Sequence, residues 1–241
     1  MEMKETVLGI QVNTETYDEL IEQIFDRIEK KEKSLIVAIN PEKIMKAKDD
    51  PALKKLLNEA EFQIPDGIGV ILASKLQKGN IIERVTGIDM MMRICEEAAK
   101  KQKRIFLYGG KPGVAASAAE KLKELYPGIQ IAGIQHGYEK DNAKVVANIN
   151  EAKPDILFVA MGSPKQENWI NANRDQLYPI IYQGVGGSFD VLAGNVKRAP
   201  EFFQKIGLEW FYRLMLEPKR IKRQMALPKF LIEVIRSKKA N

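Results

Sequence analysis

The chain has 241 residues, of which 45% are hydrophobic and 29% are charged, which fits one large folded domain or one domain with a small appendage. No apolar run approaches the roughly 20 residues of a membrane span, and the N-terminus lacks the basic and apolar regions of a secretory signal. The single cysteine, Cys95, excludes an intrachain disulfide, so we expect a cytoplasmic protein with Cys95 as a small core residue.

Apolar, strand-like runs alternate with helical patterns along the chain. Residues 6–12 predict a first short strand, and Thr16 and Glu19 form a capping box at the start of a helix. The run SLIVAI (34–39) predicts a buried strand that ends at Asn40-Pro41, a natural N-cap and first-turn pair. Further strands are expected at 104–110, 129–134, 155–161 and 179–187, with helices at 87–102, 112–126, 141–152 and 165–175.

This alternation, with nearly continuous apolar strands, predicts an α/β fold in which helices cover both faces of a mostly parallel sheet. In open sheets of this kind, ligands bind outside the carboxyl ends of the strands. Polar and glycine positions that follow the apolar runs should therefore meet at one rim. They are Asn40, Asp66, Gly109-Gly110, Met161-Gly162 and Gly184–Gly187.

The C-terminal part of the chain is strongly basic. From Lys205 onward there are ten Lys and Arg residues against three Glu, which gives this segment a net charge of +7. The whole chain has a net charge of +6. We therefore expect a body over residues 1–195 and a basic helical appendage over residues 196–241, with helices broken near Pro218 and Pro228. This asymmetry favours an anionic partner, which is a membrane surface, a nucleic acid or a phosphorylated substrate.

Aromatic and aliphatic side chains lie among the cations of the appendage. The segment WFYRLML (210–216) is followed by a cluster of Lys and Arg residues, a mixture typical of segments that bind anionic lipid. The same mixture also occurs in RNA-binding proteins. We favour the membrane surface, because no RNA-binding motif occurs elsewhere in the chain.

Asp66 stands in the stretch IPDGIGV, between an apolar run and a helical pattern. Most Asp residues at such a position are N-caps, whose carboxylate accepts a backbone N–H at the start of a helix. An ionised Asp within reach of a hydroxyl can also act as a general base. The residues alone favour the cap.

Three further stretches combine small residues with polar ones. GGKPGVA (109–115) offers a helix N-terminus to a phosphate or is only a glycine-rich turn, and it is neither GxGxxG nor a Walker loop. In MGSPKQENWI (161–170), polar side chains could hold a sugar or a base, or the segment is a capped amphipathic helix with Trp169 in the core. GVGGSFDVLAG (184–194) indicates close approach of the backbone to a ligand.

Metal ligands are scarce in the sequence. His136 is the only histidine and lies far from Cys95, which makes a zinc site improbable. There is no G-x-S-x-G motif for a Ser-His-Asp triad. There is also no D-x-D pair, which often holds a divalent cation against a nucleotide diphosphate. We expect no metal and no cofactor.

Seven motifs stand in a characteristic order. They are PDGIGV, ERVTGIDM, LYGGKPGVA, HGY, ILFVAMGSPKQENWI, GVGGSFDVLAGNVKRAP and GLEWFYRLMLEPKR. In this order, from about Leu35 to Pro228, the chain resembles the WecG/TagA/CpsF glycosyltransferase family. The resemblance implies a Rossmann-like domain with a C-terminal appendage that aids membrane association and can complete the active site. It also implies an inverting, metal-independent transfer of N-acetylmannosamine from its UDP-sugar to undecaprenyl-diphosphate-linked N-acetylglucosamine, a step of wall teichoic acid synthesis.

The resemblance also implies roles for particular residues. Asp66 matches the general base of the family. Asn40, Arg84 and Gln166 match residues of the substrate pocket. Arg213, Arg220 and Arg223 match cations of the appendage, which would reach a diphosphate. We expect UDP to bind along the strand ends, at Gly109, Gly110, Gly113, Gly186 and Gly187. Two departures, Ala38 where the family often has Thr and Gln135 where many members have His, leave the donor sugar less certain.

Other functions stay open. The same family includes enzymes that use other donors, such as N-acetylmannosaminuronic acid or glucose. A nucleotide-binding oxidoreductase is a second class, and the lack of GxGxxG argues against it. A nucleic-acid-binding module is a third class, which depends on the basic appendage alone. Self-association of the chain is compatible with the family, and we expect the protein at the inner face of the cell membrane without a nucleic-acid partner.

Overall fold

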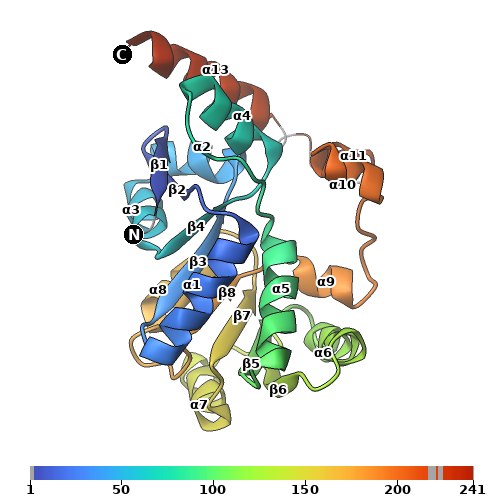
Figure 1. Ribbon diagram of the computed structural model, residues 1–241. Helices are drawn as coiled ribbons and strands as arrows, with labels where there is room; N and C mark the ends of the chain where they lie inside the picture. The colour runs from blue at the N-terminus through green and yellow to red at the C-terminus, as the bar shows by residue number, and fades with distance from the viewer. Residues whose placement is uncertain (1–2, 217–220, 222–224, 241) are drawn as a thin grey trace.

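The computed structural model describes residues 3–216, 221 and 225–240 (Figure 1). Within these residues, six strands form a sheet in the order β4-β3-β8-β7-β5-β6, and every pairing in it is parallel. The strands are β3 (Ser34–Ile39), β4 (Phe62–Pro65), β5 (Arg104–Gly109), β6 (Gln130–Gln135), β7 (Ile156–Ala160) and β8 (Ile181–Gly184). The predicted α/β fold with a parallel sheet is confirmed.

The prediction of a single strand over residues 6–12 is wrong. This segment belongs to a separate antiparallel hairpin of β1 (Lys4–Val7) and β2 (Ile10–Asn13). Leu8 and Gly9 turn the chain, with φ angles of 48° and 82°. Positive φ at both central residues matches the right-handed twist of a hairpin, but Leu rarely adopts it, so the sequence gives little sign of the turn.

Helices cover both faces of the sheet and enclose one apolar core on each. The first core packs under α2 (Pro41–Asp49), α3 (Pro51–Glu59), α4 (Ile68–Gln77), α7 (Asn142–Ala152), α8 (Lys165–Asn173) and α13 (Ala226–Ala240). The second packs under α1 (Tyr17–Lys30), α5 (Gly87–Lys100), α6 (Val114–Leu125) and α9 (Ser188–Leu192). In β3, Leu35 and Val37 contribute to the first core and Ile36 to the second, because successive side chains of a strand point to opposite faces.

Local capping signals place several helix starts. The capping box of Thr16 and Glu19 is present at α1, and Asn40 Oδ1 accepts a hydrogen bond from Lys43 N at 2.9 Å to cap α2. Asp50 caps α3 in the same way. The predicted helices that follow β4, β5, β6 and β7 begin and end within a few residues of α5, α6, α7 and α8.

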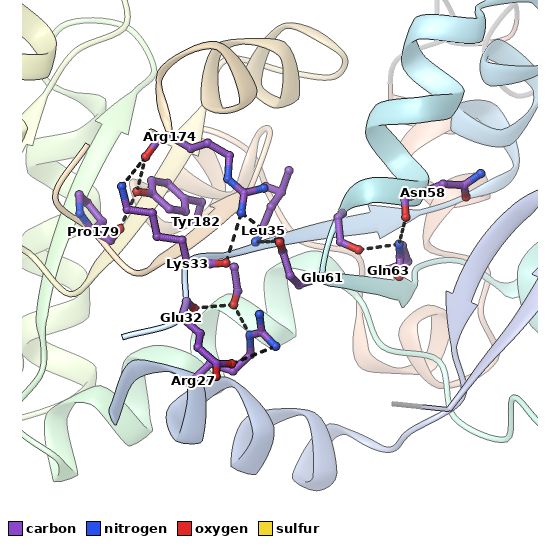
Figure 2. Close-up of polar contacts among 12 residues, drawn as sticks. Arg27, Glu32, Lys33, Leu35, Asn58, Glu61, Gln63, Arg174, Pro179 and Tyr182 are labelled. Carbon is purple, nitrogen blue, oxygen red and sulfur yellow. Dashed lines mark hydrogen bonds and ion pairs between the residues drawn. The ribbon is translucent and has the colours of Figure 1, made fainter. Parts of the chain in front are cut away.

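A polar network fastens the amino-terminal ends of β3, β4 and β8, at the rim away from the strand ends that carry the glycine loops (Figure 2). Arg174 Nη2 donates to Glu61 Oε1 at 3.0 Å and to Lys33 O at 3.2 Å. The other carboxylate oxygen of Glu61 accepts Leu35 N at 2.7 Å. Burial raises the pKa of the Tyr182 hydroxyl, which donates to backbone carbonyls nearby. This rim is therefore held by structural contacts.

After α9, residues 193–200 lead to α10 (Glu201–Lys205), α11 (Glu209–Leu216) and then α13. Helix α13 packs against α2 and α4, as Figure 1 shows, and its Phe230 and Val234 are fully buried in the first core. Met225 is in a turn and α13 begins at Ala226, so a helix boundary lies near Pro228, as predicted; Pro218 lies outside the described residues. Within the described ranges, no helix is long and apolar enough to cross a bilayer.

Candidate functional site

A cavity of about 420 Å³ lies at the carboxyl ends of β3, β4, β7 and β8. One side of it is polar and is formed by strand ends and by the first turns of helices. The other side is formed by α4 and by the segments of α11 and α13 that face it. The sequence-predicted residues that line this cavity are Asn40, Asp66, Arg84, Gln166, Gly186 and Gly187.

Asp66 follows β4 directly, and its backbone N–H donates to Ile39 O at 2.8 Å. The N-cap position of α4 is Gly67, which has a φ of 103°, so the interpretation of Asp66 as the N-cap residue is wrong. A methyl group added to Gly87 would lie 3.9 Å from Asp66 Oδ2 and 3.4 Å from the Cβ of Ala38. The carboxylate therefore lies in the cavity beside the first turn of α5 and close to Ala38.

Several helices begin at the cavity, among them α2, α4 and α5. At α5, Thr86 Oγ1 caps Asp89 N at 3.2 Å, and Thr86 N donates to the hydroxyl of Tyr17 at 2.6 Å. Burial raises the pKa of Tyr17 to about 12, so this hydroxyl stays neutral at physiological pH. Gly87 and Ile88 then line the cavity. Helix N-termini carry partial positive charge and free N–H groups, which favour bound anions.

Arg84 connects the body of the protein to the segment after α9. Its Nη2 atom donates to Gln204 O and to Glu209 Oε2, both at 3.1 Å. Glu209 Oε1 lies 3.6 Å from Arg198 Nε, and Arg198 pairs in turn with Asp89 at 2.7 Å. Within the described part of the chain, hydrogen bonds engage only the Nη2 atom of Arg84, so its Nε and Nη1 groups can donate to a ligand.

Gln166 joins two loops at the floor of the cavity. Its amide oxygen accepts Gly162 N at 3.1 Å and Gly186 N at 3.0 Å, and its amide nitrogen donates to Glu167 Oε1 at 3.2 Å. Glu167 also pairs with Lys43 of α2 at 2.7 Å, and both side chains are buried. Burial alone would raise the pKa of the Glu167 carboxyl, but the Lys43 ammonium and the hydrogen bonds hold it below its usual range.

The charges that line the cavity are mixed. The carboxylates of Glu42, Asp66 and Glu209 line it, together with the cations Lys43 and Arg84. Both cations already have a carboxylate partner. Attraction of an anion by the described residues therefore depends on the helix N-termini and on the remaining N–H groups of Arg84. The predicted Arg220 and Arg223 lie outside the described residues, as does the side chain of Arg213 on α11.

The glycines after β5 lie elsewhere on the same rim. Gly113 lines a second cavity of about 350 Å³ with Gln135 and His136. Gly109 and Gly110 line neither cavity. A methyl group at Gly109 would lie 2.3 Å from Ala160 O, so this glycine permits β5 and β7 to approach closely. The structure brings Asn40, Asp66, Arg84, Gln166 and the Gly186-Gly187 pair together and leaves the Gly109–Gly113 loop to the side.

Sequence reasoning missed Lys43 and Glu209 at this site. Their partners, Glu167 and Arg84, are more than 120 residues away along the chain, and no local pattern indicates such a pair. Trp210, which lines the cavity next to Glu209, was interpreted only as part of an interfacial segment. In the described part of the chain, no group of three or more His, Cys, Asp or Glu side chains is placed to hold a metal ion.

Comparisons with known proteins agree over almost the whole chain. Residues 5–241 match the sequence profile of the Glycosyl transferase WecG/TagA/CpsF family. A Bacillus spizizenii protein named N-acetylglucosaminyldiphosphoundecaprenol N-acetyl-beta-D-mannosaminyltransferase is 41% identical over 208 residues, covering 86% of this chain and 81% of its own. Proteins with the same name from Bacillus subtilis strain 168 and Staphylococcus aureus strain NCTC 8325 are 41% and 35% identical, over 88% and 98% of this chain and 83% and 94% of their own.

Proposed function

Because the chain belongs to the WecG/TagA/CpsF family of glycosyltransferases, we propose that it transfers N-acetylmannosamine from UDP-N-acetylmannosamine to undecaprenyl-diphosphate-linked N-acetylglucosamine. The sugar and the acceptor are those in the names of the relatives, and the UDP donor follows from the family resemblance. The observation that carries the proposal is that Asp66 lines a cavity together with Arg84 and the N-termini of α2, α4 and α5.

In this reaction, a hydroxyl oxygen of the acceptor attacks the anomeric carbon of the donor sugar. The new carbon–oxygen bond forms while the bond to the β-phosphate oxygen breaks, and UDP leaves from the opposite face, so the configuration is inverted. Asp66 takes the proton of the attacking hydroxyl as general base. The departing diphosphate gains negative charge, which the Arg84 guanidinium and the first turn of α5 stabilise.

The remaining lining residues hold the donor. The amide oxygen of Asn40 caps α2, while its amide nitrogen makes no hydrogen bond within the described residues and can donate to the sugar or the diphosphate. Gly186 and Gly187 line the cavity, and a methyl group on either would meet nothing within 4 Å, which leaves room for a ligand against the backbone. The uridine extends along the rim toward Gly109, Gly110 and Gly113.

The acceptor is a membrane lipid, so the enzyme works at a membrane surface. We place it on the inner face of the cell membrane, with the basic appendage on anionic lipid and Arg213, Arg220 and Arg223 near a diphosphate. The stabilising groups named above supply the charge that a metal ion supplies in other glycosyltransferases, so the reaction is expected to proceed without one. Self-association of the chain is compatible with this arrangement.

The test is the release of UDP from UDP-N-acetylmannosamine with a short-chain lipid-diphosphate N-acetylglucosamine acceptor and EDTA. We expect acceptor-dependent release by the wild-type protein and a loss of about a thousandfold in Asp66→Asn, the range for a general base. Asp190→Asn, which removes a nearby carboxylate outside the cavity lining, serves as the matched control and should retain activity. Substantial turnover by Asp66→Asn would exclude Asp66 as the base.

The donor sugar is the least constrained part of the proposal. Ala38 lies beside Asp66 and Gly87 and replaces the Thr that the family often has, so a hydroxyl that could bind the donor is absent here. If UDP-N-acetylmannosamine gives no transfer, a competition assay with UDP-glucose and the UDP derivative of N-acetylmannosaminuronic acid identifies the donor.

A further inference from the structure

The wall of the cavity opposite the sheet is apolar. Ile68 of α4, Trp210 of α11 and Leu227 of α13 line it. These elements are in close contact there. A methyl group on Gly69 would lie 2.7 Å from Leu227 Cδ1, and one on Gly207 would lie 3.0 Å from the Cβ of Ile68. The polar half of the cavity suits a sugar and a diphosphate, whereas this half suits neither.

Apolar side chains continue from this wall to the surface along α4. Ile68, Leu72 and Leu76 are spaced by four residues, so they lie on one face of the helix. Ile68 lines the cavity, while Leu72 and Leu76 are 40% and 38% exposed. From the first to the last of these residues the helix rises about 12 Å. A row of apolar groups therefore leads from the cavity to solvent.

A second row runs along α13. Leu227, Leu231 and Ile235 are also spaced by four, and Ile235 is 47% exposed. Glu233, on the opposite flank of α13, pairs with Lys48 of α2. Because α13 packs against both α2 and α4, the flank with Leu231 and Ile235 lies toward α4, and Figure 1 shows the two helices side by side. We call these two rows, Ile68, Leu72, Leu76, Leu227, Leu231 and Ile235, the apolar seam.

We propose that the apolar seam holds the part of the acceptor's polyprenyl chain next to its diphosphate, an inference that rests on the proposed function. Ile68 and Leu231 pack partly against the first core, whereas Leu72, Leu76 and Ile235 are exposed. Isolated apolar residues are ordinary on protein surfaces, but apolar residues exposed as a group are typical of binding sites. The seam starts inside the cavity that holds the reacting sugars. Its ligand is therefore a chain that is covalently continuous with a molecule in that cavity.

Trp210 lies between the polar half and the apolar half of the cavity. It follows Glu209, the partner of Arg84, and lines the same cavity as Leu227. Its indole Nε1 is buried and has no hydrogen-bond partner among the described residues, so a donor is available at the junction of the polar and apolar halves. A molecule with a diphosphate head and a hydrocarbon chain contacts both the polar and the apolar side of this junction. Binding to a bilayer or to a second copy of the protein does not require a site that combines the two.

The test compares farnesyl diphosphate with inorganic diphosphate, in titrations followed by intrinsic tryptophan fluorescence. The wild-type protein should bind farnesyl diphosphate more tightly than inorganic diphosphate. The double variant Leu72→Gln, Leu76→Gln changes exposed residues and should fold. We expect its Kd for farnesyl diphosphate to rise about tenfold, or about 1.4 kcal/mol, and its Kd for inorganic diphosphate to stay the same.

The matched control is Leu125→Gln with Ile134→Gln, which changes residues 44% and 45% exposed on α6 and β6 and should alter neither Kd. Equal weakening of both ligands by the seam variant, or no weakening, would overturn the proposal. A variant that changed only binding to phosphatidylglycerol vesicles would assign the seam to bulk lipid and overturn the proposal. A variant that changed only the sedimentation coefficient would assign the seam to a second copy of the protein and would also overturn it.

The titration is independent of the transfer assay. If the wild-type protein transfers sugar but the seam variant binds farnesyl diphosphate normally, the seam assignment fails and the proposed function stands. If the seam variant shows the expected loss while the wild-type protein transfers no sugar from any UDP donor, the substrates proposed above fail and the prenyl site stands.

Discussion

The amide oxygen of Gln166 accepts the backbone N–H groups of Gly162 and Gly186 and so ties together the loops after β7 and β8. The sequence predicts Gln166 as a substrate contact. Its position on the cavity is compatible with that role, but its amide is already engaged in holding the glycine loops. At the residue scale, a polar side chain in a cavity can therefore act on a ligand through the backbone that it positions.

The buried pair of Lys43 and Glu167 gives a first prediction, on stability. Removing one partner of a buried ion pair leaves an uncompensated charge and typically costs about 3–5 kcal/mol. Glu167→Gln should therefore lower the free energy of unfolding by about 3 kcal/mol, measured by urea denaturation at pH 7. Replacing both partners, with Lys43→Met and Glu167→Leu, should cost less than either single change. A larger cost for the double variant would mean that the pair is not the source of the effect.

The same pair predicts a pH dependence. The pKa of Glu167 is lower in the folded protein than its ordinary value, so its contribution is fully present above the pKa of the unfolded chain, near 4.3. This stabilisation is lost as the pH falls through the folded value. The stability difference between wild type and Glu167→Gln should therefore shrink below about pH 4, in urea titrations repeated at several pH values. A constant difference would exclude ionised Glu167 as its cause.

At the scale of elements, the contact between α4, α2 and α13 depends on one glycine. A methyl group on Gly69 would lie 2.4 Å from Pro41 Cγ and 2.7 Å from Leu227 Cδ1. Gly69→Ala should push α13 away from α4, and we expect faster proteolysis within α13 and a loss of about 1–3 kcal/mol in stability, the range for overpacking. Gly187→Ala makes the same change where nothing lies within 4 Å, so α13 should stay protected. Equal proteolysis in both variants would contradict the prediction.

How far the elements could be predicted depended on whether their signals were local. Asn40 caps α2 as expected, because an N-cap and a following Pro act within one turn. The turn at Leu8 was missed, because a left-handed Leu carries no recognisable signal. The position of Asp66 at the rim followed from the parallel sheet, but its neighbour Gly87 and the Arg84–Glu209 pair depend on tertiary packing and could not be inferred from spacing.

At the scale of the whole molecule, the chain carries its positive charge at one end. Residues from Lys205 onward hold the +7 balance, and Lys229 and Lys238 are exposed on α13. Reversing both to Glu should weaken binding to anionic vesicles at least tenfold at low salt, since each Lys near such a surface contributes about 1 kcal/mol. The difference should shrink in high salt, where charges are screened. Vesicle sedimentation measures both effects.

The control reverses Lys121 and Lys123, which are exposed on α6, a helix well away from α13 (Figure 1). The net charge changes equally in the two variants, so only the position differs. Similar losses in both would show that net charge alone decides binding, and the appendage would then have no special role at the membrane.

The place of β8 in the sheet has a consequence for how the protein folds. β8 comes last among the sheet strands along the chain, yet it lies between β3 and β7. Until it is inserted, β4-β3 and β7-β5-β6 are separate half-sheets, and pairing partners so distant in sequence form slowly. Asp66 belongs to one half, while Gly162 and Gln166 belong to the other. The catalytic cavity is thus a product of the final joining step, and refolding protein should regain enzymatic turnover only in its slowest kinetic phase, after most of its helical circular dichroism has returned.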